Sequence, residues 1–154
     1  MIKIFKYFVV IFFILSNNSI SEIVEPSSKI EPYQVIKIQL NSLMKNDNPR
    51  KDSGIEQTWN FAHPNNKQYT GPLEKFKTLL KGNSYSMLLN HSEHVIKQVY
   101  ISEDVATFEV MVLDIDKNYY KFKWQVEKYQ KDGPLKDCWL TTAVSQPVSL
   151  GSSI

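Results

Sequence analysis

Two segments in the second half of the chain alternate between hydrophobic and polar residues. From Tyr120 to Glu127, Tyr, Phe, Trp and Val alternate with Lys, Lys, Gln and Glu, and residues 105–114 carry a similar pattern. Because successive side chains of a strand point to opposite faces, this spacing predicts antiparallel strands with one dry and one wet face. Two segments rich in β-formers, 94–102 and 138–148, are predicted as neighbouring strands. The predicted dry face is Ala106, Phe108, Val110, Val112, Tyr120, Phe122, Trp124 and Val126.

The first half of the chain has helical spacing instead. Between Pro32 and Asn46, apolar residues recur at intervals of three and four, which predicts an amphipathic helix. Pro32 suits its first position, where the missing N–H costs nothing. Gln39 lies beside the apolar stripe and is either a buried polar anchor or a partly exposed side chain. The stripe consists of Ile36, Leu40, Leu43 and Met44.

Two shorter helices are predicted before the strands begin. Ser53 and Glu56 form a capping-box pattern. The helix that they open should end near Ala62, because the next residue precedes a proline and is pushed out of the α region. A further helix is predicted from Pro72 to Gly82, with Gly82 ending it in a left-handed conformation. The residues between these two helices are predicted to form a loop.

Three helices followed by a meander of about four strands form an α+β pattern. The apolar face of the sheet has to be buried against the helices, and a curved, mainly antiparallel sheet wrapped around them would enclose a cone-shaped interior. With 154 residues the chain suits one domain, which is predicted to span residues 32–148. Residues 22–31 are interpreted as a linker, and residues 149–154 as a frayed tail.

The segment 1–21 has the features of a secretory signal peptide. Lys3 and Lys6 precede an apolar run, and Ser19 and Ser21 stand at the −3 and −1 positions of a cleavage site that ends the segment. As a helix the apolar run would be about 14 Å long, far short of the about 30 Å of a bilayer core. The pattern predicts export. The alternative is an uncleaved membrane anchor.

The charge balance argues against nucleic acid as a partner. The chain carries 18 Lys and Arg against 16 Asp and Glu, and two of the lysines lie in the segment 1–21, so the mature chain is close to neutral. Nucleic-acid binding depends on a basic surface that neutralises phosphates, and membrane contact is expected only through an uncleaved leader. The single cysteine, Cys138, leaves no disulfide framework and is predicted to be a small buried hydrophobe.

Five segments between residues 32 and 148 carry a resemblance to a family. They are VIKIQLNSLMKNDNP, GIEQTWNFAHPNNK, TGPLEKFKTLL, YKFKWQVEKY and CWLTTAV. They resemble a domain family of unknown function, found in cyanobacteria, plants and algae, within the nuclear transport factor 2-like superfamily, also called the SnoaL-like or α+β cone fold. With the leader, the resemblance implies export to the periplasm or the thylakoid lumen. It implies a fold but no reaction, because the family has no assigned chemistry.

The candidate catalytic residues are Asp114, Tyr120 and His63. Asp114 and Tyr120 share the inward phase of their strands and flank the same turn, so a carboxylate base could lie beside a hydrogen-bond donor. The competing interpretation is that Asp114 starts the turn, where Asp side chains bond nearby backbone N–H groups. His63 is either a base at the mouth of the cone or a residue that bonds the last carbonyls of a helix.

Aromatic side chains are the candidates for the walls of a ligand site, namely Trp59, Tyr69 and Trp124. For the tryptophans the alternative is a plain core role. His91 and His94 are three residues apart at a turn into a strand, where residues three apart face opposite sides, so no metal site is predicted. No cofactor is predicted.

The sequence favours a non-catalytic exported domain that binds a small apolar ligand or a protein partner, with a homodimer through the open face of the sheet as one arrangement. The alternative is a small enzyme of the isomerase, dehydratase or hydrolase type that uses Asp114 and Tyr120, with or without His63. Relatives elsewhere in the superfamily include both enzymes and binding proteins, so the fold does not choose between them. A third hypothesis is an accessory protein of a membrane complex, held there by its leader.

Overall fold

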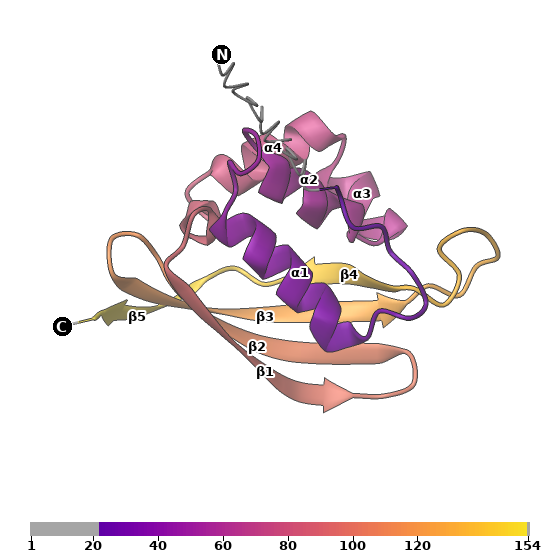
Figure 1. Ribbon diagram of the computed structural model, residues 1–154. Helices are drawn as coiled ribbons and strands as arrows, with labels where there is room; N and C mark the ends of the chain where they lie inside the picture. The colour runs from indigo at the N-terminus through magenta and orange to yellow at the C-terminus, as the bar shows by residue number, and fades with distance from the viewer. Residues whose placement is uncertain (1–21, 154) are drawn as a thin grey trace, which may run out of the picture.

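The computed structural model describes residues 22–153, and the α+β class predicted from the sequence is confirmed. Four α-helices are followed by a short 3-10 turn, η1, and by five strands (Figure 1). Their bounds are α1 Pro32–Met44, α2 Ser53–Asn60, α3 Pro64–Thr70, α4 Leu73–Lys81, η1 Ser86–Leu88, β1 Glu93–Ile101, β2 Val105–Leu113, β3 Asn118–Lys128, β4 Trp139–Val144 and β5 Val148–Ser152.

The strands form one curved, open sheet in which every pair of neighbouring strands is antiparallel. The spatial order is β1-β2-β3-β4, and β5 also pairs with β3. Strand β3 is long enough to hold both partners, with β4 along residues 124–128 and β5 along residues 118–121. The helices all lie over one face of the sheet (Figure 1). Because β1 pairs only with β2, and β4 and β5 pair only with β3, β1 forms one border of the sheet and the β4–β5 pair forms the other.

The predicted dry face is the face that meets the helices. Every residue of the prediction is buried except Tyr120, which is half-buried near the start of β3. Cross-strand register explains the agreement, because directly paired residues share a face: Phe108 lies opposite Trp124, and Val110 opposite Phe122. The helical side of this core comes mainly from α1, through Val35, Ile36, Leu40 and Leu43.

The prediction of three helices was wrong, because the expected loop before Gly71 contains α3. Pro64 is at the start of this helix, and the Nδ1 atom of His63 accepts a hydrogen bond from the backbone N–H of Asn65 at 3.1 Å. This side-chain cap satisfies one of the N–H groups that a helix start leaves without a partner. The helix has only seven residues and buries none of them, so it leaves no apolar periodicity in the sequence.

Two predicted helix ends differ from the structure, and one is confirmed. The expected capping box at Ser53 is wrong, since Asp52 holds the N-cap position in a left-handed conformation with φ 63°. Gly82 ends α4 with φ −77°, which is not the left-handed conformation that was expected. Pro32 does begin α1, and the capping box belongs to that helix, between Glu31 and Gln34.

Both segments that flank the predicted domain are bound to it. In the expected linker, the backbone N–H of Val24 donates to Gln57 Oε1 at 2.7 Å, and Gln57 Nε2 donates to the Val24 carbonyl at 2.9 Å. The prediction of a frayed tail at residues 149–154 was wrong, because residues 149–152 belong to β5. The predicted last strand, 138–148, ends at Val144, and β5 begins at Val148 after a break of three residues. The predicted signal peptide, residues 1–21, lies outside the described residues.

Helices α1 and α2 approach each other to backbone contact at Gly54. A Cβ atom built on Gly54 would lie 2.2 Å from the Ser42 carbonyl oxygen and 2.9 Å from Asn46 Cα, which no side chain can tolerate. The Gly54 N–H donates to the Asn46 carbonyl at 2.9 Å. Glycine is therefore required here for close approach rather than for an unusual φ.

Candidate functional site

A largely apolar cavity lies between the four α-helices, the η1 region and the sheet. It has a volume of about 80 Å³. Leu43, Phe76 and Leu80 supply apolar walls from the helices, and Trp124 supplies one from the sheet. None of the residues that line the cavity is charged at neutral pH.

Gln39 organises the polar side of this cavity. Its Oε1 atom accepts hydrogen bonds from Thr141 Oγ1 at 2.7 Å and from Trp124 Nε1 at 3.1 Å, and its Nε2 atom donates to the Thr58 carbonyl at 3.1 Å. These contacts join α1, α2, β3 and β4 through a side chain that is only 1% exposed. Among the described residues no buried side-chain nitrogen or oxygen is without a partner, so this cluster is satisfied without a ligand.

Asp114 and Tyr120 are brought to one hollow, but it is a different one. The hollow has a volume of about 360 Å³ and lies between the η1 region and the β2–β3 turn. Asp114 Oδ1 accepts hydrogen bonds from the backbone N–H groups of Asp116 and Asn118, at 2.9 and 2.8 Å. This is the turn geometry of the competing interpretation. The turn therefore accounts for the burial of the Asp114 carboxylate.

His63 and Tyr69 do not join that hollow or each other's surroundings. His63 caps the start of α3, rather than bonding the last carbonyls of α2, and its ring packs edge-on against Tyr129 with 5.3 Å between centroids. Burial lowers the pKa of His63, so its ring is neutral at neutral pH. The Tyr69 side chain is 79% exposed on α3. The structure does not unite these two residues in a site.

Of the two tryptophans predicted as ligand walls, only Trp124 reaches the cavity. Trp59 packs against Phe76 with 5.1 Å between ring centroids, and the ammonium group of Lys67 lies 5.2 Å from the centre of its ring. A Cβ atom on Gly71 would come within 2.5 Å of the Trp59 ring. Trp59 is thus part of the packing that joins α2 to α3 and α4.

His91 and His94 are hydrogen-bonded to each other, contrary to the expectation that they face opposite sides. His91 Nε2 lies 2.8 Å from His94 Nδ1, and His91 Nδ1 lies 2.7 Å from the Leu88 carbonyl oxygen. A carbonyl can only accept, so His91 donates from Nδ1 and accepts at Nε2. The left-handed Asn90, with φ 55°, redirects the chain just before β1. Burial lowers the pKa of His91 to about 4.

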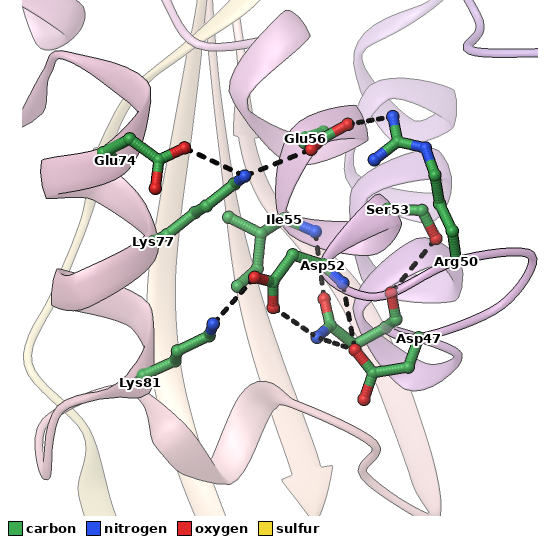
Figure 2. Close-up of polar contacts among 10 residues, drawn as sticks. Asp47, Arg50, Asp52, Ser53, Ile55, Glu56, Glu74, Lys77 and Lys81 are labelled. Carbon is green, nitrogen blue, oxygen red and sulfur yellow. Dashed lines mark hydrogen bonds and ion pairs between the residues drawn. The ribbon is translucent and has the colours of Figure 1, made fainter.

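A polar cluster joins the α1–α2 loop and α2 to α4 (Figure 2). Lys81 Nζ lies 2.7 Å from Asp52 Oδ2, and Lys77 Nζ lies 3.2 Å from Glu56 Oε1. The ion pair with Lys81 holds the pKa of Asp52 below its ordinary value. Arg50 pairs with Glu56 from the other side. Each of these carboxylates already has a cation beside it, so the cluster has a structural role.

The border strand β1 carries the densest group of exposed apolar residues in the described part of the chain. The exposed fractions are 58% for Val95, 50% for Val99, 56% for Tyr100 and 51% for Ile101. β1 pairs only with β2, so no described strand hydrogen-bonds to its outer side. Figure 1 shows β1 as the lower border of the sheet.

Comparisons with known proteins add no relatives: no family model, no curated protein and no solved structure matches the chain. Between residues 22 and 153, no helix is long and apolar enough to cross a membrane. The same residues contain no group of three or more His, Cys, Asp or Glu side chains that could hold a metal ion. Cys138 is buried, as predicted, and is a free cysteine in this part of the chain.

Proposed function

We propose that the protein is a non-catalytic binding domain whose binding element is the outer side of β1, and that its partner is a protein. The observation that carries the proposal is a nine-residue border strand, residues 93–101, with a large share of its apolar side chains exposed and no described strand on its outer side. Such a strand offers a row of unpaired N–H and C=O groups to an extended segment of another chain.

Proteins that avoid such pairing protect their border strands with short length, charge, bulges or a covering element. β1 has one lysine, Lys97, and a bulge between Gln98 and Tyr100. The six residues before the bulge, 93–98, are regular and pair in register with β2. A partner strand therefore has a continuous template along the first half of β1.

A small ligand in the cavity fits the geometry less well. The cavity measures about 80 Å³, whereas a cavity that holds benzene measures about 150 Å³ and ordinary ligand pockets measure about 300 to 1,000 Å³. Gln39, Thr141 and Trp124 satisfy one another. No buried side-chain nitrogen or oxygen of the described lining lacks a hydrogen-bond partner that a ligand could supply.

An enzyme at Asp114 and Tyr120 remains the alternative hypothesis, supported by the hollow that both residues line. Proton transfer needs a base that is free to reach the substrate. Asp114 Oδ1 already holds two backbone N–H groups, and His63 lies at the start of α3 instead of in this hollow. The proposal of a binding domain therefore places no reaction there.

Membership of the nuclear transport factor 2-like superfamily is likewise a proposal, as are the cone shape and export through the segment 1–21. The α+β class, with helices over one face of a curved sheet, supports the first two. None of these points is needed for the role of β1, which rests on its exposure and its place at the border.

Photo-crosslinking from β1 tests the binding proposal. Benzoylphenylalanine replaces Tyr100 in the full-length chain in its own host, and the same replacement at Tyr69, an exposed tyrosine on α3, is the matched control. We expect a defined protein adduct from Tyr100 and none of that mass from Tyr69. If Tyr100 gives no adduct, or the same adducts as Tyr69, the border strand is not the binding element.

A further inference from the structure

We propose that the occupant of the β1 border is a second copy of this chain, with the two β1 strands antiparallel and Val95 opposite Val95. The inference rests on the proposed function and names its partner. It places a twofold axis at Val95, perpendicular to the sheet. The same surface of each copy then meets itself, as in most homodimers.

The charges on β1 are arranged for this pairing. His94 and Ile96 lie opposite the buried Val112 and Val110 of β2. They therefore belong to the face that meets the helices, because paired residues share a face. The outer face of β1 must then carry the residues between and beside them, which are Glu93, Val95 and Lys97. An acid, an apolar residue and a base follow one another along one face.

In an antiparallel pair centred on Val95, the row Glu93, Val95, Lys97 of one copy lies opposite the row Lys97, Val95, Glu93 of the other. Residue numbers of opposite partners then add to 190, so Glu93 faces Lys97 of the second copy and Lys97 faces Glu93 of the second copy. Opposite charges directly across an antiparallel pair are favourable, and like charges are unfavourable. Both charged residues of this half of the strand are exposed in the single copy and gain a partner of opposite sign in the pair.

Other symmetric registers lack this match. Centring the pair on His94 or Ile96 puts Val95 opposite a charged residue. Centring it on Lys97 puts two lysines opposite each other, and it also runs into the bulge between Gln98 and Tyr100. Among registers that keep the helices of both copies on one side of a continuous sheet, only the Val95 register pairs both charges.

The competing interpretation is that Lys97 and the bulge protect a monomer, because a lysine and a bulge are the usual defences of a border strand. The two interpretations differ in what Lys97 faces. In a monomer the exposed Lys97 has only Glu109 of β2 opposite it, and reversing its charge changes nothing in the assembly state. In the proposed dimer the charge of Lys97 faces Glu93 of the second copy. Reversing it should therefore weaken the dimer, and reversing Glu93 as well should restore it.

A cysteine at the axis gives the sharpest test. Opposite Cα atoms of an antiparallel pair lie about 4.5 to 5.5 Å apart, within the range that a disulfide spans. We expect the full-length Val95→Cys chain to form a disulfide-linked dimer under mild oxidation, about tenfold faster or more than Val148→Cys. Val148 is a matched control, because it is an exposed valine at the other border, with 54% of its side chain exposed against 58% for Val95. Equal rates for the two variants would overturn the proposal.

Charge reversal tests the register without adding a thiol. Analytical ultracentrifugation of the full-length chain should show a dimer whose dissociation constant rises about tenfold or more in Lys97→Glu and in Glu93→Lys. The double exchange Glu93→Lys/Lys97→Glu should restore the original constant. Lys123→Glu is the control, since Lys123 is exposed on β3, inside the sheet rather than at its border. Circular dichroism verifies that each variant is folded.

The outcomes separate this inference from the proposed function. A dimer whose dissociation constant is unchanged in both Lys97→Glu and Glu93→Lys is formed elsewhere, and a chain that stays monomeric at every concentration has no second copy at β1. Either result overturns the second-copy proposal. If Tyr100 nevertheless crosslinks to a protein of another sequence, β1 remains the binding element with a different partner. If it crosslinks to nothing, both proposals fail.

Discussion

The two borders of the sheet are built in opposite ways. At the open border, formed by β1, nine residues run past the helices with no described segment on their outer side. At the covered border, formed by β4 with residues 61–63, the chain before α3 lies against the strand. The His63 N–H donates to the Thr141 carbonyl and the Thr141 N–H donates to the Phe61 carbonyl, both at 2.8 Å.

This difference separates two uses of a strand. At the covered border, the backbone groups of Thr141 form hydrogen bonds within the molecule, and its side chain donates a hydrogen bond to Gln39. This border therefore stabilises the fold. The open border contributes its inner face to the core and keeps its outer side for another chain. Mutations at the covered border should change stability, whereas mutations on the outer face of β1 should change association.

The largest loss of stability is expected from Gln39→Leu, which removes the side chain that ties the covered border to α1. Thr141 Oγ1 loses its acceptor and the Thr58 carbonyl loses its donor. Buried polar groups without partners cost about 1 to 3 kcal/mol each, so we expect the free energy of unfolding to fall by about 3 kcal/mol.

Equilibrium unfolding in urea measures this change. Gln68→Leu is the control, because Gln68 is exposed on α3 and a surface substitution of this kind changes stability by about 0.5 kcal/mol or less. If the two leucine variants were equally stable, the Gln39 cluster would contribute nothing to the covered border.

A smaller, pH-dependent loss is expected where the open border begins. The pKa of His91 is about 4 in the folded protein because the ring is buried, against about 6.5 in an unfolded chain. The unfolded state thus binds more protons between these values. The stabilisation of the folded state by the neutral His91 ring is complete above about pH 6.5 and is lost as the pH falls towards 4. Between pH 7 and pH 5 the loss should be about 2 kcal/mol.

Urea unfolding at the two pH values tests this expectation. His91→Asn should show a shallower fall, because asparagine does not titrate in this range. His63→Asn removes another histidine and keeps a capping side chain. Burial lowers the pKa of His63 as well, by less than that of His91, so this variant should show a fall between that of the unchanged protein and that of His91→Asn. A fall of equal size in all three proteins would assign the pH dependence to other groups.

The smallest effect is expected at the start of α3, beside the covered border. His63→Ala removes the Nδ1 acceptor of the Asn65 N–H, and loss of an N-cap costs about 1 kcal/mol. The backbone bond from residue 63 to Thr141 does not involve the side chain and should survive. Thermal unfolding should show a lower midpoint for His63→Ala than for His63→Asn. An unchanged midpoint in both would mean that the cap contributes no stability.

The inner face of the sheet was predictable because its pattern is local. A side-chain period of two fixes which residues share a face, and the eight predicted dry positions follow it in β2 and β3. Helix α3 was not predictable in the same way, because it buries no residue and its start depends on a histidine cap. Short polar helices carry no periodic signal.

The candidate sites were harder to predict than the fold, because their contacts join distant residues. Gln39 meets Thr141 across 102 positions of the sequence, and no local spacing encodes that pairing. The histidine pair was missed for a local reason, since the left-handed Asn90 changes the direction of the chain before β1. Asp114 was found, and the turn interpretation of its carboxylate matches its hydrogen bonds.

Gly54 allows α1 and α2 to lie unusually close together. With no methyl group between them, α1 and α2 touch backbone to backbone, and the Thr58 carbonyl one turn further along α2 comes within 3.1 Å of Gln39 Nε2. A single added carbon at Gly54 would wedge the two helices apart and lift that carbonyl away from the amide. The hydrogen bond between Gln39 and the Thr58 carbonyl therefore depends on the absence of a Cβ atom at Gly54. The contact of Gln39 with Thr141 on β4 depends on it in turn.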